Sequence, residues 1–143
     1  MSEKIQRRKL RNLQVGLVTF HYTTNYGGVL QAFALTKLLE NLGVEVSIVD
    51  YRPVRALRVY AKQLFVNKAF GQGFLKYLKF ARFIALNLNL SSYRCYNRKK
   101  LARVCASYNA FIVGSDEVWK TKSFRGFDPT YFLDFAGNRQ KKN

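Results

Sequence analysis

The feature that most constrains the fold is a change of hydrophobic period between residues 13 and 51. Residues Leu13-Gln-Val-Gly-Leu-Val-Thr-Phe20 form a β-rich run that becomes apolar on both faces, as a buried parallel strand requires. A polar loop with two glycines follows over residues 21–28, and from Val29 the apolar residues recur at helical spacing. Residues 44–51 alternate again towards a second strand. This order predicts a parallel strand pair joined by a right-handed helical crossover.

Within the predicted helix, a four-residue spacing of apolar side chains predicts the face that packs on the sheet. These residues are Leu30, Ala34, Leu38 and Leu42, with Leu35 and Leu39 beside them. Gly43 follows directly and predicts the end of the helix, because glycine adopts the left-handed conformation of a C-cap at little cost.

The middle of the chain is basic and contains no acidic residue from Tyr51 to Ser115, although 13 Lys and Arg lie there. We expect a basic helical crossover over residues 52–107, with two or three helices broken near residues 71–73 and at residues 91–92. Residues 108–113 predict a third strand. The predicted apolar stripe of the crossover is Phe74, Leu75, Leu78, Ala81, Ala85 and Leu88.

Length and composition predict one folded domain over residues 13–135, a basic N-terminal arm over residues 1–12 and a basic tail over residues 136–143. With 48% hydrophobic and 15% aromatic residues, the chain is not a disordered basic tail. One histidine and two cysteines without a C-x-x-C exclude a multi-histidine metal site and support neither a disulfide scaffold nor a zinc knuckle. We therefore expect no metal.

Localisation and surface charge also follow from the composition. The N-terminal residues lack the apolar core of a signal peptide, and the most apolar stretch is interrupted by Arg82, Asn87 and Asn89. The sequence therefore predicts a soluble, cytoplasmic protein. Its formal charge of +17 predicts a surface that attracts anions.

Two loops follow predicted strands, and ligands of parallel sheets collect at that edge. If the third strand pairs beside the first, the two loops meet at one crevice. In the first loop, Gly27 and Gly28 bring backbone amides and a helix N-terminus together, which suits a phosphate or carboxylate. Ordinary turn chemistry explains the same glycines. In the second loop, which begins at Gly114, Asp116 can hydrogen-bond sugar hydroxyls while Trp119 supplies an apolar face. The alternative is that Ser115 or Asp116 only caps a helix.

His21 is the one catalytic candidate, because imidazole titrates near neutral pH and this residue ends the first strand. The alternative is a buried, hydrogen-bonded imidazole that holds the loop. Tyr22 and Tyr26 either stack on a sugar ring or cover the edge of the sheet. Basic neighbours of Cys95 and Cys105 can lower thiol pKa values, and ordinary packing thiols are the alternative.

Four segments in this order resemble the landmarks of the polysaccharide pyruvyl transferase family. They are Val18-Thr-Phe-His-Tyr-Thr-Thr-Asn-Tyr-Gly-Gly-Val-Leu-Gln-Ala-Phe-Ala-Leu35, Leu42-Gly-Val-Glu-Val-Ser-Ile-Val-Asp-Tyr51, Tyr108-Asn-Ala-Phe-Ile-Val-Gly-Ser-Asp-Glu-Val-Trp119 and Tyr131-Phe-Leu-Asp-Phe135. The resemblance implies an α/β, Rossmann-like parallel sheet with flanking helices, as half of a GT-B-type two-domain architecture.

The resemblance also implies an activity. Members of the family transfer pyruvate from phosphoenolpyruvate onto two sugar hydroxyls of a glycan as a ketal, with release of phosphate and no cofactor. By resemblance, the N-terminal wall of the cleft is lined by His21, Asn25, Gly27, Gly28, Gln31, Ser115 and Asp116. Two departures stand out, since Glu117 and Lys120 replace the Gln and Asn expected around Trp119.

The length leads to a further expectation about partners. A two-domain enzyme needs about twice these 143 residues. We therefore expect a truncated, N-terminal half that is inactive alone and is completed by a separate second half or by a homo-oligomer. The acceptor implied by the resemblance is a glycan or a lipid-linked sugar.

The basic charge leaves other partners open. Aromatic and basic residues interleave over residues 57–103, as in single-strand nucleic-acid binders, but no known nucleic-acid motif is present, so this partner is the less favoured. Basic helices with an apolar stripe also dock on anionic membranes, which predicts a peripheral position on the cytoplasmic membrane face. The third interpretation is that these helices cover the sheet and face a missing domain.

Overall fold

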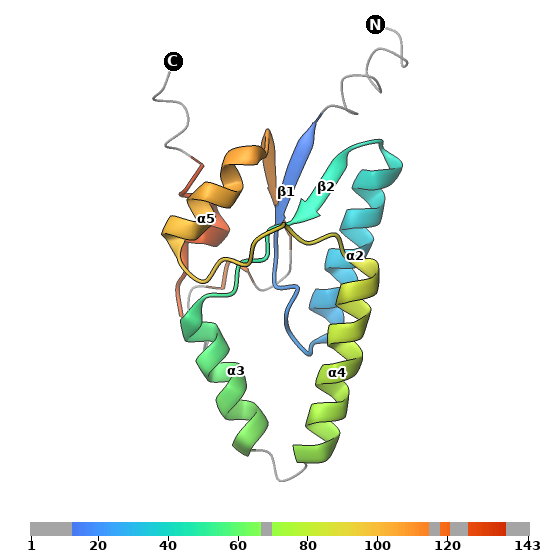
Figure 1. Cartoon of the computed structure of the whole chain (residues 1–143), viewed down its shortest axis with the longest axis vertical. Coiled ribbons are helices and arrows are strands. Elements are labelled where there is room, and N and C mark those ends of the chain that lie inside the picture. Colours follow the sequence, from blue (N-terminus) through green and yellow to red (C-terminus); the bar gives the residue numbers. More distant parts are fainter. Residues whose placement is uncertain (1–12, 67–69, 115–117, 121–125, 137–143) are drawn as a thin grey trace, which may run out of the picture.

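The computed structural model describes residues 13–66, 70–114, 118–120 and 126–136 (Figure 1). The predicted N-terminal arm, and the predicted tail apart from Ala136, lie outside these ranges. So do Ser115, Asp116 and Glu117 of the second predicted loop.

The described residues form a three-stranded parallel sheet that confirms the predicted α/β class. Strand β1 is Gln14–Val18, β2 is Glu45–Ile48 and β3 is Ala110–Val113. The strand order is β2-β1-β3, and β1 pairs in parallel with both neighbours. The third strand therefore lies beside the first.

Helices α2 (Tyr26–Asn41) and α5 (Arg98–Val104) flank this sheet, and α3 (Val54–Val66) and α4 (Phe70–Asn87) extend past the carboxyl ends of its strands (Figure 1). Short 3-10 helices lie at Cys105–Ser107 and Pro129–Phe132. Helix α2 is followed by Gly43 at φ 80°, as predicted for its C-terminal end. No helix among the described residues combines the length and the apolar character that crossing a bilayer requires.

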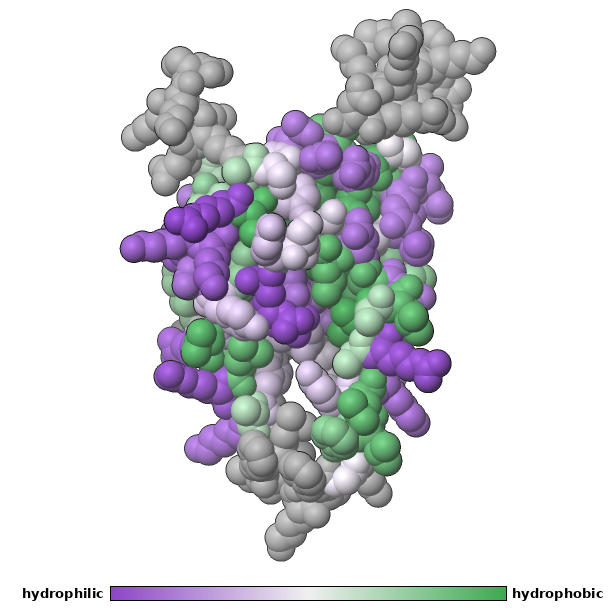
Figure 2. All heavy atoms as spheres, in the orientation of Figure 1, coloured by the Kyte–Doolittle hydropathy of each residue, from purple (hydrophilic) through white to green (hydrophobic). Residues whose placement is uncertain are grey.

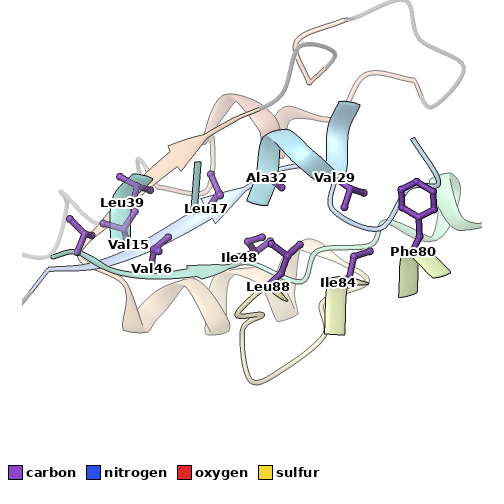
Figure 3. Packing of buried hydrophobic residues seen from close by; sticks show 11 residues of the cluster. Val15, Leu17, Val29, Ala32, Leu39, Val46, Ile48, Phe80, Ile84 and Leu88 are labelled. Atoms are coloured by element: carbon purple, nitrogen blue, oxygen red, sulfur yellow. The ribbon is translucent and has the colours of Figure 1, made fainter. Parts of the chain in front are cut away.

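Both faces of the sheet are covered, which explains why its strands are apolar on both sides. On one face, α2 and α4 pack against side chains such as Leu17 and Ile48 (Figure 3). On the other face, Val18 and Val49 pack in a second cluster that includes Leu101 of α5 and Tyr131 near the C-terminal end of the described chain. The site discussed below lies where the loops leave this core.

The four-residue row predicted to pack on the sheet is wrong, although Leu39 beside that row is buried. Leu30, Leu38 and Leu42 are about half exposed, whereas the buried residues are Gly28, Val29, Ala32, Thr36 and Leu39. The small side chains on this second face let the helix approach the sheet closely. A Cβ atom on Gly28, for example, would lie 3.4 Å from the carbonyl oxygen of Phe20. Close approach, rather than leucine content, decides which face is buried.

The predicted stripe and one predicted break of the crossover are also wrong. Gly71 and Gly73 lie inside α4 rather than between helices, while the break near residues 91–92 agrees with the helix end at Asn87. Of the predicted stripe only Leu88 is buried, and the side chains that pack on the core are Phe80, Ile84 and Leu88. Apolar residues occur around the whole circumference of α4, so the period alone does not select a face.

Candidate functional site

The order of the strands places a ligand site at the carboxyl end of β1. The chain passes from β1 to β2 on one side and returns to β3 on the other, so the strand order reverses at β1. Loops that diverge at such a switch point leave a crevice between them. The amide of Gly114 donates to the carbonyl of Val18 over 3.2 Å, which places the start of the second loop beside the end of β1. The pairing of β3 beside β1, on which the predicted convergence of the two loops depends, is observed, while the convergence itself stays a prediction because Ser115 and Asp116 lie outside the described residues.

The polar groups of the first loop are largely engaged with one another. Asn25 is the N-cap of α2, and its side-chain oxygen accepts from the amide of Gly27 over 3.0 Å. Thr23 is buried, and its hydroxyl accepts from the amide of Asn25 over 3.4 Å. This network fixes the entry into the helix. It also occupies the Gly27 amide that was a candidate for binding an anion.

The loop positions His21 against a buried carboxylate. The imidazole is fully buried, and its Nε2 lies 2.9 Å from Oδ1 of Asp50, two residues after the end of β2. Its Nδ1 lies 3.2 Å from the carbonyl oxygen of Thr19. Because an ionised carboxylate only accepts hydrogen bonds, Nε2 is the donor to Asp50. This geometry matches the alternative in which His21 holds the loop.

Asp50 also receives two arginines from different parts of the chain. Arg52 donates to it through Nε and a terminal nitrogen, and Nε of Arg94 donates to Oδ2 over 3.0 Å. The backbone supports this arrangement, since the amide of Arg52 donates to the carbonyl of Cys95 and the amide of Cys95 donates to the carbonyl of Asp50. Two guanidinium groups against one carboxylate leave the cluster with a net positive charge.

The electrostatics of this cluster favour the ionised carboxylate. Burial alone would raise the pKa of Asp50, but hydrogen bonds from His21 and Arg52, together with their charges, hold that pKa well below its usual range. A carboxylate that is only 4% exposed is therefore kept charged. It can orient the two arginines at the mouth of the crevice.

The depressed pKa of Asp50 predicts a specific acid dependence of stability. Folding favours the ionised form, so the contribution of Asp50 is complete above the unfolded-state pKa of about 3.9 and is lost as the pH falls below it. We expect the wild-type chain to lose stability between about pH 5 and pH 2, and the stability difference from Asp50→Asn to shrink over the same range. Urea unfolding at a series of pH values measures that difference. A constant difference would contradict the assignment.

A cleft of about 210 Å³ opens beside this cluster. Both arginines line this cleft, together with apolar side chains of α4. Arg52 lies over the ring of Tyr22, 5.8 Å from its centroid, and this ring packs edge-on against His21. The lining residues are Tyr22, Thr23, Thr24, Arg52, Tyr77, Phe80, Ala81, Ile84, Ala85, Leu90 and Arg94. The cleft therefore combines positive charge with an aromatic and apolar wall, which suits a small organic anion.

The other predicted site residues lie in different surroundings. Tyr26 is exposed and packs on Phe80 at a centroid distance of 4.7 Å, with the ammonium of Lys76 5.4 Å from its ring. Gln31 is exposed on α2. Trp119 is exposed, and its Nε1 donates to the carbonyl of Tyr131. Of the predicted residues, Tyr22 lines the cleft, and His21 packs behind it against the ring of Tyr22.

The glycine at the start of the second loop has a packing role. A Cβ atom on Gly114 would lie 2.7 Å from Cδ2 of Leu35, so α2 leaves no room for a side chain there. Ser115 and Asp116 lie outside the described residues, and their predicted contacts with a sugar stay predictions.

Sequence reasoning missed Asp50, Arg52 and Arg94 as site residues. A signal was present, because Asp50 lies near the carboxyl end of the second predicted strand and no acidic residue occurs from Tyr51 to Ser115. A lone carboxylate at the carboxyl end of a parallel strand, with many arginines downstream, indicates a buried charge that needs partners. The sequence does not show which of those arginines reach it.

Neither thiol nor metal chemistry gains support at this site. Burial raises the pKa of the Cys95 thiol and the charge of Asp50 adds to that effect, which argues against a thiolate nucleophile. Within the described ranges, no group of three or more His, Cys, Asp or Glu side chains gathers in a way that could hold a metal ion.

Comparison with known proteins gives one result. The sequence model of a family described as polysaccharide pyruvyl transferase matches residues 25–143. The matched range begins at the N-cap of α2 and includes Asp50, Arg52 and Arg94, while His21 and Tyr22 precede it. No curated protein and no solved structure matches the chain.

Proposed function

The chain belongs to the polysaccharide pyruvyl transferase family, and on this basis we propose that it takes part in pyruvyl transfer from phosphoenolpyruvate to sugar hydroxyls of a cell-surface glycan. The observation that carries the proposal is the family match over residues 25–143, which includes the charged cluster at the cleft. The acceptor is a glycan or a lipid-linked sugar with two neighbouring hydroxyl groups.

The reaction makes clear demands on the protein. One sugar hydroxyl adds to C2 of phosphoenolpyruvate while a proton is added to the methylene carbon. A second hydroxyl then displaces phosphate from C2 as the ketal forms. Of the two hydroxyl protons, one makes up for the proton added to the methylene carbon and the other leaves with the phosphate. Phosphoenolpyruvate carries a carboxylate and a phosphate, so the site must offer cations that are already oriented.

Arg52 and Arg94 meet that demand in our proposal. Their guanidinium groups are oriented by Asp50 and line the cleft, and guanidinium is the side-chain group best suited to carboxylate and phosphate. The apolar wall of Phe80 and Ile84 would face the methylene group or the sugar ring. We assign His21 a positioning role, because both of its ring nitrogens face protein oxygens.

Deleting the gene in its host tests this function directly. We expect the ketal methyl resonance to disappear from the proton NMR spectrum of the purified surface glycan and to return when the wild-type gene is supplied. The glycan backbone signals serve as the internal control, since loss of the whole polymer has other causes. An unchanged ketal signal in the deletion strain would refute the proposal.

A further inference from the structure

The outward face of α4 carries leucines that the core does not use. Leu75, Leu78 and Leu86 are 59%, 44% and 72% exposed. At 100° per residue they lie on the side of the helix opposite Phe80 and Ile84, which pack on the sheet. A surface helix of a globular protein normally presents polar residues there. Helix α4 is therefore apolar towards the core and apolar outwards.

Cations alternate with these leucines along the same helix. Lys76, Lys79 and Arg82 are exposed, and among the described residues no carboxylate pairs with Lys79 or Arg82. Helix α3 adds Arg55, Arg58 and Lys62, which are also exposed. Figure 2 shows green and purple side chains next to one another over α4. The sequence places no acidic residue anywhere in either helix.

The apolar surface continues sideways from α4 towards α2. A groove of about 260 Å³ lies between the two helices and is lined by Tyr26, Val29, Leu30, Lys79, Phe80 and Phe83. Leu30 is half exposed at this groove, and Lys79 is the charged residue among the described residues that line it. The exposed leucines of α4 thus belong to a wider apolar area that cations border.

We propose that the outward face of α4 docks on an anionic lipid bilayer. In this arrangement the helix lies in the plane of the interface, with Leu75, Leu78 and Leu86 in the outer acyl region and Lys79 and Arg82 at the depth of the headgroups. Charge complementarity selects a negatively charged partner. The leucines select lipid over nucleic acid, because bases stack on aromatic rings and gain little from branched aliphatic side chains.

The docking surface is independent of the proposed function, and its test needs no substrate. The full 143-residue chain is sedimented with vesicles of phosphatidylcholine alone and of phosphatidylcholine mixed with phosphatidylglycerol. We expect binding at low salt to the anionic vesicles only. The double variant Leu75→Gln/Leu86→Gln should lower the partition coefficient at least about tenfold, because apolar contacts are lost while the charge is kept.

Matched leucines in α2 and at its C-cap provide the control. Leu38→Gln/Leu42→Gln changes two similarly exposed leucines outside α4, and its partition coefficient should stay within about twofold of wild type. Circular dichroism confirms that each variant keeps its fold. A second variant, Lys79→Gln/Arg82→Gln, should weaken binding and flatten its dependence on salt.

Three outcomes would overturn the inference. The first is that the wild-type chain fails to sediment with anionic vesicles at low salt. The second is that the α4 leucine variant binds these vesicles as tightly as wild type, which indicates attraction by charge alone. The third is tight binding of mixed oligonucleotides that the α4 leucine variant loses, which makes nucleic acid the occupant of this face.

Discussion

Asp50→Asn is expected to lower the free energy of unfolding by about 3–5 kcal/mol at neutral pH, as measured by urea denaturation. Asparagine keeps the shape of the side chain but removes the charge that accepts from His21, Arg52 and Arg94. The substitution leaves buried donors facing an amide that can satisfy only part of them. The effect is large because the carboxylate is almost completely buried and joins three segments of the chain.

An exposed carboxylate provides the matched control for this prediction. Glu40 pairs with Lys37 on the surface of α2 over 2.7 Å, and both side chains are accessible to water. Exposed pairs of this kind contribute about 0–1 kcal/mol, so Glu40→Gln should leave stability almost unchanged. If both variants lose the same small amount, the Asp50 cluster is not a structural centre of the fold.

The sheet could be predicted from the sequence because strands that are buried on both faces leave a strong local signal. The run from Val15 to Phe20 is almost entirely buried, which explains its continuous apolar character. The placement of β3 beside β1 was predicted only as a condition for the two loops to meet, because strand order depends on long-range pairing. Gly16 shows that dependence, since a Cβ atom there would lie 2.8 Å from the ring of Phe111 on β3.

The faces of the helices could not be predicted because both α2 and α4 carry apolar residues around their circumference. In α2 the buried row includes Ala32 and Thr36, and the hydroxyl of Thr36 is satisfied by the carbonyl of Ala32 over 2.8 Å. A polar residue whose hydrogen bond is made within its own helix can be buried cheaply. A prediction from hydrophobic spacing does not recognise such a buried threonine, and it assigns the exposed leucines to the buried face instead.

The sequence located only part of the candidate site, because the other part depends on contacts between residues that are far apart in the chain. The loop from His21 to Gly28 is a local motif and could be found from its glycines. The cluster on Asp50 depends on Arg94, which lies 44 residues further along the chain. Isolated parallel bridges between Ile48 and Leu90 and between Tyr51 and Cys95 bring those segments together. No short sequence motif predicts that pairing.

Arg94→Gln is expected to weaken phosphoenolpyruvate binding by about 10- to 100-fold, which is the usual worth of a charged hydrogen bond to an anion. The prediction follows from the proposed donor site, in which this guanidinium lines the cleft. Isothermal titration calorimetry with phosphoenolpyruvate measures the change. Arg94 is the better residue to replace, because its side chain is half exposed and Asp50 keeps its hydrogen bonds from His21 and Arg52 when Arg94 is lost. Arg52 is more buried, so its loss would mix binding with folding.

The control must separate the cleft from the general positive field of a chain with a net charge of +17. Arg103→Gln removes the same charge from α5, where the residue is exposed and does not line the cleft. If only the overall charge attracts the anion, both variants should lose the same small amount of affinity. Added salt should then remove their difference from wild type, because salt screens long-range attraction. Direct contact predicts a loss specific to Arg94→Gln that persists in salt. Equal losses in the two variants would move the donor site away from Asp50, because the anion would then sense only the overall charge.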